Sequence, residues 1–381
     1  MKNLSRRDWF RKSFTAAAGV VAGTSVFDQL LAAPVSRAEA VHQLRVPAGG
    51  KLVRLGSNEN PYGPSAKARQ AIVDAMGEFN RYSFEAVMEF RKTLAEKEGV
   101  TPDHILVVNG SSETLCLSGM VAKLEGGAVL SAFPTFRSLM EYAEKLNARW
   151  DRVDLDEYHV HNLEALAAAV KSDTRMLFVC NPNNPTGTVV EGARYRDFCL
   201  EMSKKTTVLA DEAYLEFLEP REQRSMVELV RQGQNIIVSR TFSKVAGLAG
   251  LRIGYCVAPP DTIRKLQKFQ MGPVINQAAL AAAKVSLGDT AFAEMTRAKN
   301  NEALKYFLTY LDQKKWFHGA SRANCVLFPA PKDGKTILAE TEKRGFQIRV
   351  WDYQGKEWCR VSIGTLDEMK AFTKVFDEVV A

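Results

Sequence analysis

Short, nearly continuous apolar runs recur along the chain, separated by stretches with helical periodicity. Runs that are apolar at every position are typical of strands covered on both faces, and strands alternating with helices predict a parallel α/β sheet. Gly, Pro and Asn cluster directly after several runs. Because ligands in open α/β sheets bind beyond the carboxyl ends of the strands, we expect a ligand site at that edge. The predicted strands are Ile105–Val108, Ala128–Ser131, Arg175–Cys180, Thr207–Ala210 and Ile236–Ser239.

Changes in pattern along the chain predict its domain organisation. Helix-like stretches lie between the strands, for example Leu163–Val170 and Ala193–Lys204. A long helical stretch from about Asn276 to Leu311 is expected to leave the large α/β domain, and strands near Cys325–Phe328 and Arg360–Ile363 then indicate a smaller α+β domain. We divide the chain into a signal at residues 1–40, an N-terminal arm at 41–78, a large domain at 79–287 and a small domain at 288–381.

The first forty residues read as a targeting segment. Arg6-Arg7 is followed by aromatic residues, an apolar run from Ser13 to Phe27 and a small-residue site, Ala38-Glu39-Ala40. This order is typical of a secretory signal, and the arginine pair resembles a bacterial twin-arginine signal. We expect a periplasmic protein without stable membrane insertion after export. A basic amphipathic first helix or an uncleaved anchor is the alternative.

Charge, cysteines and histidines exclude several classes of function. The formal net charge is +7, and no run of Lys or Arg interleaved with aromatic residues is present, so nucleic acid is not an expected partner. The six cysteines form no C-x-x-C pair and most lie in apolar runs, which predicts buried free thiols. The five histidines lack ligand spacing, so we expect no metal site.

The most informative segment runs from Thr241 to Arg252 and follows an apolar strand. Lys244 in this position suits a Schiff base with an aldehyde cofactor. Ser243 and the guanidinium of Arg252 could bind a phosphate on that cofactor. A solvated lysine in a Gly-rich loop is the alternative.

Three further segments place polar groups at strand ends. Asp211 ends a strand, where a carboxylate could pair with a protonated pyridine nitrogen, although an Asp there could equally cap a helix. The turn Asn181–Gly187 could aim an amide into the site, or serve only as a turn. The segment Asn109–Glu113 opens a helix whose free amides could bind phosphate, or form only a capping box.

Taken in order, these segments resemble fold-type I pyridoxal-phosphate aminotransferases, and among them the histidinol-phosphate aminotransferase branch. Three further motifs carry that resemblance. Ser57–Ser65 is similar to the branch's N-E-N-P-x-G-P-S motif, Asn80–Tyr82 to its R-Y segment, and Trp358–Thr365 to its R-I-x-x-G-T motif. The similarity runs from about residue 52 to the end. It implies a mostly parallel large domain with a smaller α+β domain, and a homodimer with shared sites.

The resemblance also implies roles for single residues. The catalytic residues would be Lys244, Asp211 and Tyr214, with Lys244 holding pyridoxal 5'-phosphate and moving protons. The cofactor would further contact Phe136, which stacks on its ring, and Ser111, Ser112, Asn184, Ser243, Arg252 and the neighbouring subunit's Tyr82. The substrate would contact Arg360, Arg349, Asn184 and Tyr62.

Two departures from the family pattern bear on the substrate. Phe136 stands where the family more often has Tyr, and Trp351-Asp352 follows Arg349 where the family usually has D-R. Asp352 could neutralise Arg349 in an ion pair. We therefore expect an amino-group transfer to a 2-oxo acid by ping-pong chemistry, with histidinol phosphate or an analogue as donor. Alternatives are an aromatic or other amino acid as donor, a decarboxylase or lyase on the same scaffold, or a non-catalytic module, which would be expected to lack Lys244 or Asp211.

Overall fold

The structure is a computed structural model that describes residues 52–219, 225–272 and 275–381. The predicted signal at residues 1–40 and the start of the predicted arm lie outside the described residues. Residues Ala48–Ala381 form one compact unit by their internal contacts, so the domain boundaries drawn from the sequence stay predictions.

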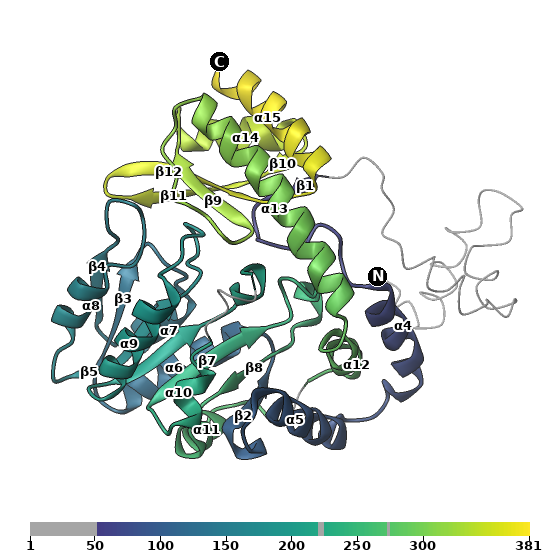
Figure 1. The fold of residues 1–381 in the computed structure, drawn as a ribbon, viewed down its shortest axis with the longest axis vertical. Coiled ribbons are helices and arrows are strands. Elements are labelled where there is room, and N and C mark those ends of the chain that lie inside the picture. Colours follow the sequence, from purple (N-terminus) through teal and green to yellow (C-terminus); the bar gives the residue numbers. More distant parts are fainter. Residues whose placement is uncertain (1–51, 220–224, 273–274) are drawn as a thin grey trace, which may run out of the picture. The chain divides into compact units, whose positions relative to one another are not determined.

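A seven-stranded sheet in the order β2-β8-β7-β6-β5-β3-β4 forms the centre of the larger layer (Figure 1). Strands β7, β6, β5, β3 and β4 are parallel, and β8 runs antiparallel to both of its neighbours, β2 and β7. The predicted mostly parallel sheet is confirmed. The strands are β2 Ile105–Val108, β3 Ala128–Phe133, β4 Trp150–Asp154, β5 Thr174–Cys180, β6 Thr207–Asp211, β7 Ile236–Thr241 and β8 Gly254–Val257.

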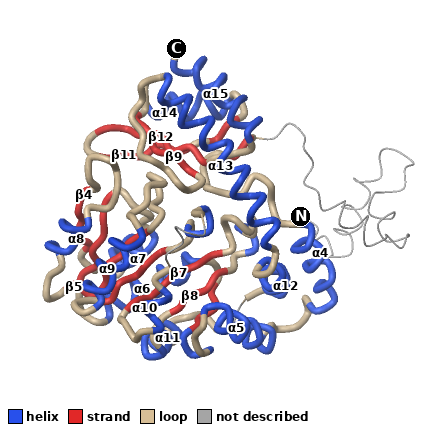
Figure 2. Tube along the Cα trace, viewed as in Figure 1, coloured by secondary structure: helices blue, strands red, loops and turns tan. Residues whose placement is uncertain are grey.

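Helices cover both faces of this sheet (Figure 2). Leu177 and Val179 of β5 belong to one buried apolar cluster, whereas Met176 and Phe178 belong to another. Successive strand residues therefore face opposite cores, which explains why the strands are apolar at every position. The first cluster is covered by α5 Phe84–Glu98, α8 Leu163–Ala169, α9 Gly192–Ser203, α10 Val227–Arg231 and α12 Gln277–Ser286, and the second by α6 Ser111–Leu124, α7 Ser138–Lys145 and α11 Pro260–Gln267.

The helical stretch expected from Asn276 to Leu311 is two helices. After α12, residues 287–289 interrupt the helix, and α13 Thr290–Gln313 begins beyond them. Asp289 precedes α13 and forms an ion pair with Lys67 at 2.9 Å, which adds a tertiary contact at the break. Figure 1 shows α13 running from beside α12 toward the C-terminal elements.

The C-terminal elements form a second layer with its own core. Strands β11, β12 and β9 make an antiparallel sheet in that order, which includes both of the strands predicted here. The aromatic and aliphatic side chains of α13, α14 and α15 pack against this sheet. The elements are β1 Val53–Arg54, β9 Cys325–Pro329, α14 Gly334–Lys343, β10 Phe346–Gln347, β11 Arg349–Tyr353, β12 Lys356–Ser362 and α15 Leu366–Val380, and near the start of the described chain α4 Ala66–Asp74.

The six cysteines are free thiols and five of them are buried, which confirms that prediction. Within residues 52–219, 225–272 and 275–381, no three His, Cys, Asp or Glu side chains come together in a way that could hold a metal ion. No helix in this part of the chain combines the length and apolarity needed to cross a membrane.

Candidate active site

A cavity of about 260 Å³ lies beyond the carboxyl ends of β6 and β7, at the sheet edge where the sequence predicts a ligand site. Side chains from both layers line it. Most of the residues proposed from the sequence are among them, namely Ser111, Ser112, Phe136, Asn184, Asp211, Tyr214, Ser243, Lys244, Arg252, Arg349 and Arg360.

Lys244 follows the end of β7 in a tight loop, which places its amine in the cavity. Its Nζ donates to the backbone carbonyl of Asn58 at 3.1 Å and more weakly to that of Ser57 at 3.4 Å. Burial, with a smaller contribution from the guanidinium of Arg360, lowers the pKa of Lys244 to about 8. A larger share of the amine is therefore unprotonated near neutral pH than for an ordinary lysine, as a nucleophile or general base requires.

Asp211 is the last residue of β6 and is only 2% exposed. Its carboxylate accepts a hydrogen bond from the backbone N–H of Ala213 at 3.2 Å, and no Lys or Arg of the described chain forms an ion pair with it. Burial raises the pKa of Asp211 to about 7. A buried carboxylate in this state needs a cationic partner, and a protonated pyridine nitrogen would supply one.

The start of α6 forms the seat expected for a phosphate. Gly110 precedes the helix with φ +79°, and a Cβ at this position would lie 2.5 Å from Nη2 of Arg252. Glycine therefore leaves the space in which the guanidinium lies beside the helix N-terminus. Arg252 Nη1 donates to Ser243 Oγ at 3.4 Å. Free helix amides, hydroxyls and a guanidinium together fit a phosphate group.

The alternative of a plain capping box at this helix is met only in part. Glu113 accepts a hydrogen bond from the backbone N–H of Asn109 at 2.6 Å, as in such a box. No side chain caps the helix, so the hydroxyls of Ser111 and Ser112 are not used for that purpose and line the cavity.

Phe136, Asn184 and Tyr214 lie where a cofactor ring would be held. Phe136 is half-buried and lines the cavity, where its ring offers a face for stacking. Asn184 donates from Nδ2 to the phenol oxygen of Tyr214 at 3.2 Å and accepts at Oδ1 from Nη1 of Arg360 at 3.0 Å. Asn184 thus connects the ring site to the guanidinium proposed to bind substrate.

Arg349 and Arg360 are directly opposed residues of the antiparallel pair β11–β12, and both line the cavity. Arg360 is buried, donates to the carbonyl of Gly56, and has no partner for its Nε among the described residues. Burial lowers the pKa of Arg360 from its ordinary value.

The alternative in which Asp352 neutralises Arg349 is not seen. Successive residues of a strand point to opposite faces, so Asp352, three residues along β11, faces away from Arg349. In the described chain, no carboxylate forms an ion pair with Arg349 or Arg360. Glu59 also lines the cavity, but its carboxylate pairs with Arg54 at 2.5 Å.

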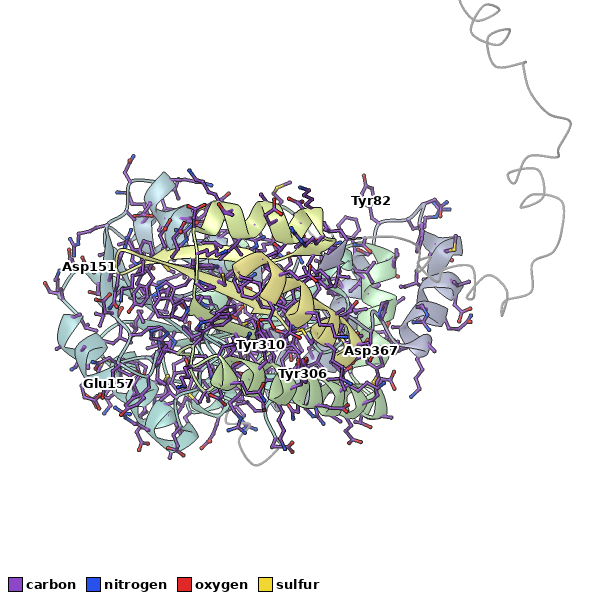
Figure 3. The ribbon with its side chains drawn as sticks, turned by 90° about the horizontal axis from the view of Figure 1, so that it is seen from above. Tyr82, Asp151, Glu157, Tyr306, Tyr310 and Asp367 are labelled. Carbon is purple, nitrogen blue, oxygen red and sulfur yellow. The ribbon has the colours of Figure 1, made fainter. Side chains whose placement is uncertain are left out.

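Two of the proposed residues, Tyr62 and Tyr82, do not line this cavity. Tyr62 is half-buried, with Nζ of Lys299 5.1 Å from its ring centre. Tyr82 is 82% exposed and projects outward from the surface, as Figure 3 shows. Its ring centre lies 5.7 Å from that of Phe84. Their assigned roles stay predictions.

Asn58 is a residue beside this site to which the sequence assigns no role. It is buried beside the cavity and donates from Nδ2 to the phenol oxygen of Tyr214 at 3.0 Å. The segment Ser57–Ser65 carries a family motif, but motif matching alone assigns no role to its first Asn. That role depends on a contact between residues 156 positions apart.

Comparison with known proteins agrees with this geometry. Residues 50–376 match the family model "Aminotransferase class I and II". Histidinol-phosphate aminotransferase 1 of Cupriavidus pinatubonensis is 35% identical over 86% of this chain and 88% of its own length. The corresponding enzyme of Moorella thermoacetica is 32% identical over 87% and 86%.

Solved structures show the same fold. A candidate histidinol-phosphate aminotransferase from Erwinia carotovora atroseptica superposes with a TM-score of 0.81 at 30% identity, over 86% of this chain and 95% of that one. Histidinol-phosphate aminotransferase from Sinorhizobium meliloti, solved with pyridoxal-5'-phosphate, gives 0.78 at 24% identity over 94% and 98%. The chain therefore belongs to the class I and II aminotransferase family and is a pyridoxal-phosphate-dependent aminotransferase.

Proposed function

We propose that this aminotransferase takes histidinol phosphate or a close analogue as amino donor and a 2-oxo acid as acceptor, in ping-pong order. The observation that carries the proposal is the opposed pair Arg349 and Arg360, which lines the cavity without a carboxylate partner in the described chain. Two adjacent guanidinium groups suit a phosphate dianion on the donor. The names of the two bacterial relatives support the same donor.

The protein's own groups divide the chemistry among them. Bound pyridoxal phosphate supplies a reactive aldehyde and a protonated ring that withdraws electrons from the donor's Cα. Asp211 holds the proton on the ring nitrogen. The Nζ of Lys244, unprotonated in part because its pKa is lowered to about 8, takes the Cα proton and later releases it. Arg360 fixes the donor's anionic group, so that the bond to be broken lies near Lys244.

An aromatic amino acid is the second candidate donor. Trp351 lies on the same face of β11 as Arg349, and its ring centre is 6.0 Å from the guanidinium carbon of Arg360. An aromatic surface beside the anion site favours a donor with a planar apolar side chain.

The test is a donor panel. We expect Arg349→Ala to lose about 10- to 100-fold in kcat/KM on histidinol phosphate and little on His, Phe or Tyr, because only the phosphate needs the second guanidinium. Arg349→Lys should recover part of this loss, since it keeps the charge but not the fork. An equal loss on all donors, or none, would show that Arg349 does not bind phosphate. Formation of pyridoxamine phosphate in a half-reaction separates transamination from decarboxylation or elimination.

We also propose that the protein is exported in folded form by a twin-arginine signal. The support is the sequence alone, Arg6-Arg7 followed by an apolar run and Ala38-Glu39-Ala40. Replacing both arginines by Lys should retain the protein in the cytoplasm, and delivery to the periplasm that persists would point to another route. A periplasmic location would argue against a role in cytoplasmic biosynthesis.

A homodimer with shared sites is the third proposal. The support is Tyr82, which lies outside its own cavity, has its ring centre 5.7 Å from that of Phe84, and lines a second pocket with Phe79. Met88, four residues after Phe84 on the same face of α5, is also exposed. Burial of such a surface against a second copy would remove it from water and could bring Tyr82 to the neighbouring cofactor.

A further inference from the structure

The segment Leu55–Asn60 touches both layers of the molecule. The backbone N–H of Leu55 donates to the carbonyl of Gln347, the last residue of β10, and its carbonyl accepts from the N–H of Ser362 at the end of β12. The carbonyls that follow, at positions 56 to 58, accept hydrogen bonds from Arg360 and Lys244. The segment therefore carries contacts from the C-terminal layer to the reactive amine.

Within this segment, Asn58 uses all of its polar groups. It is 1% exposed and has φ +51°, a left-handed conformation that few residues other than Gly and Asn adopt readily. Its N–H donates to Ser362 Oγ at 2.8 Å, and its Oδ1 accepts from the same hydroxyl at 2.8 Å. Its carbonyl accepts from Lys244 and its Nδ2 donates to Tyr214. Together these hydrogen bonds fix the orientation of the Asn58 backbone and side chain.

The consequence falls on Tyr214. A phenol oxygen can accept hydrogen bonds but carries a single proton to donate. In Tyr214 the oxygen accepts N–H groups from Asn58 at 3.0 Å and from Asn184 at 3.2 Å, and within the described chain the hydroxyl donates to no protein acceptor. The proton is therefore free to be donated into the cavity that Tyr214 lines.

We propose that Asn58 is a positioning residue, which makes Tyr214 a donor toward the cofactor's ring oxygen and holds it in fixed relation to Lys244 and Ser362. A hydrogen bond from Tyr214 stabilises negative charge on that oxygen, so less charge remains to retain a proton on the adjacent Lys244 nitrogen. Asn58 has this role only if the proposed aminotransferase chemistry takes place in this cavity.

The first measurement is the pH titration of the visible absorbance of the enzyme loaded with pyridoxal phosphate. Asn58→Gly removes the amide, keeps the carbonyl that Lys244 contacts and tolerates the left-handed backbone. We expect its titration midpoint to rise by on the order of half to one pH unit. Asn58→Asp should raise the midpoint further, because a carboxylate accepts the phenol proton and adds negative charge near Lys244.

A double-mutant cycle then tests whether Asn58 acts through Tyr214. Tyr214→Phe should raise the midpoint by itself, and Asn58→Gly should add almost nothing in that background. Asn300→Ala is the control, because Asn300 is a buried Asn of α13 whose side chain donates to the backbone carbonyl of Ala323 at 3.2 Å and does not line the cavity. We expect its midpoint to equal that of the wild type. Thermal unfolding of each protein without cofactor checks that the variants fold.

The outcomes separate this role from the proposed function. If the wild type gains no visible absorbance with pyridoxal phosphate, or if Lys244→Met keeps the wild-type spectrum, the assigned cofactor chemistry is wrong whatever Asn58 does. If the wild type titrates but the folded Asn58 variants keep its midpoint, Asn58 does not position Tyr214. Additive shifts in the cycle would likewise overturn the role.

Discussion

The half-buried Lys244 and the buried Asp211 both line the cavity, and their pKa values are shifted toward neutral pH from opposite directions. The pKa of Lys244 is lowered to about 8 and that of Asp211 is raised to about 7, in both cases mainly by burial. Each group is thereby costly to ionise in the protein alone. Pyridoxal phosphate relieves both costs, because it takes up the amine covalently and offers the carboxylate a ring cation.

The pH dependence of the stability of the cofactor-free protein should report the protonation of Lys244. Its folded pKa of about 8 lies below the ordinary value of 10.5, so the unfolded chain binds more protons between these pH values and stability rises with pH there. We expect Lys244→Met to raise the free energy of unfolding by about 1–3 kcal/mol at pH 7 and to abolish transamination. The gain should vanish above pH 10.5. Denaturant unfolding of both apoproteins across this range measures it, and a variant with unchanged turnover would refute the role of Lys244.

Asp211 should change the stability of the apoprotein with pH in the opposite direction. Its folded pKa of about 7 lies above the ordinary value of 3.8, so between these values the folded state retains a proton that the unfolded chain has lost, and stability falls as pH rises. Asp211→Asn should remove this fall in the apoprotein. The loaded variant should keep cofactor yet lose about 10²- to 10³-fold in kcat, because the ring proton loses its charged partner. A rate near that of the wild type would assign the ring nitrogen to another acid.

At the scale of elements, apolar continuity predicts β2, β3, β5, β6 and β7 of the seven-stranded sheet but not β4 and β8. β4 does not show this pattern because it is an edge strand with Asp151, Arg152 and Asp154 among its five residues. β8 is buried at all four positions but begins with Gly254 and Tyr255 directly after a Gly-rich loop, so the sequence does not show it as an apolar run. The helical pattern expected from Asn276 to Leu311 contains no proline, so it does not predict the break between α12 and α13.

The residues of the candidate site likewise include some that the sequence predicts and some that it does not. Groups at strand ends, such as Lys244 and Asp211, could be predicted because parallel strands bring their carboxyl ends to one edge. The opposition of Arg349 and Arg360 depends on the register of a hairpin, which the sequence does not fix by itself. The contacts of Asn58 join residues that are far apart in the sequence, so no local sequence pattern predicts them.

The start of α6 gives a prediction for this element. Gly110→Ala should weaken pyridoxal-phosphate binding by about tenfold or more, because the new Cβ meets Arg252 and the residue has a positive φ. Gly126→Ala is a matched control, since Gly126 has φ +75° but a methyl group added there would meet no atom within 4 Å. Equilibrium titration with the cofactor measures both. Equal affinities in the two variants would show that the space beside Arg252 is unimportant for the phosphate.

At the scale of the whole molecule, the exposed apolar surface around Tyr82 predicts a homodimer. Met88 on α5 is 62% exposed, and Met88→Lys would place a charge in the proposed interface. We expect this variant to sediment as a monomer and to retain cofactor poorly. Leu124→Lys, at an equally exposed position at the end of α6, should remain dimeric. A fully active wild-type monomer in sedimentation would contradict the shared site.

The bond between Asn58 and Ser362 joins residues 304 positions apart. Gly56 and Asn58 are synthesised 304 residues before their contacts Arg360 and Ser362, respectively. A nascent chain therefore cannot assemble this cavity until β12 has left the ribosome. Acquisition of pyridoxal phosphate in its final geometry must therefore wait for β12, and a ribosome stalled short of β12 would carry a protein unable to complete its anion site.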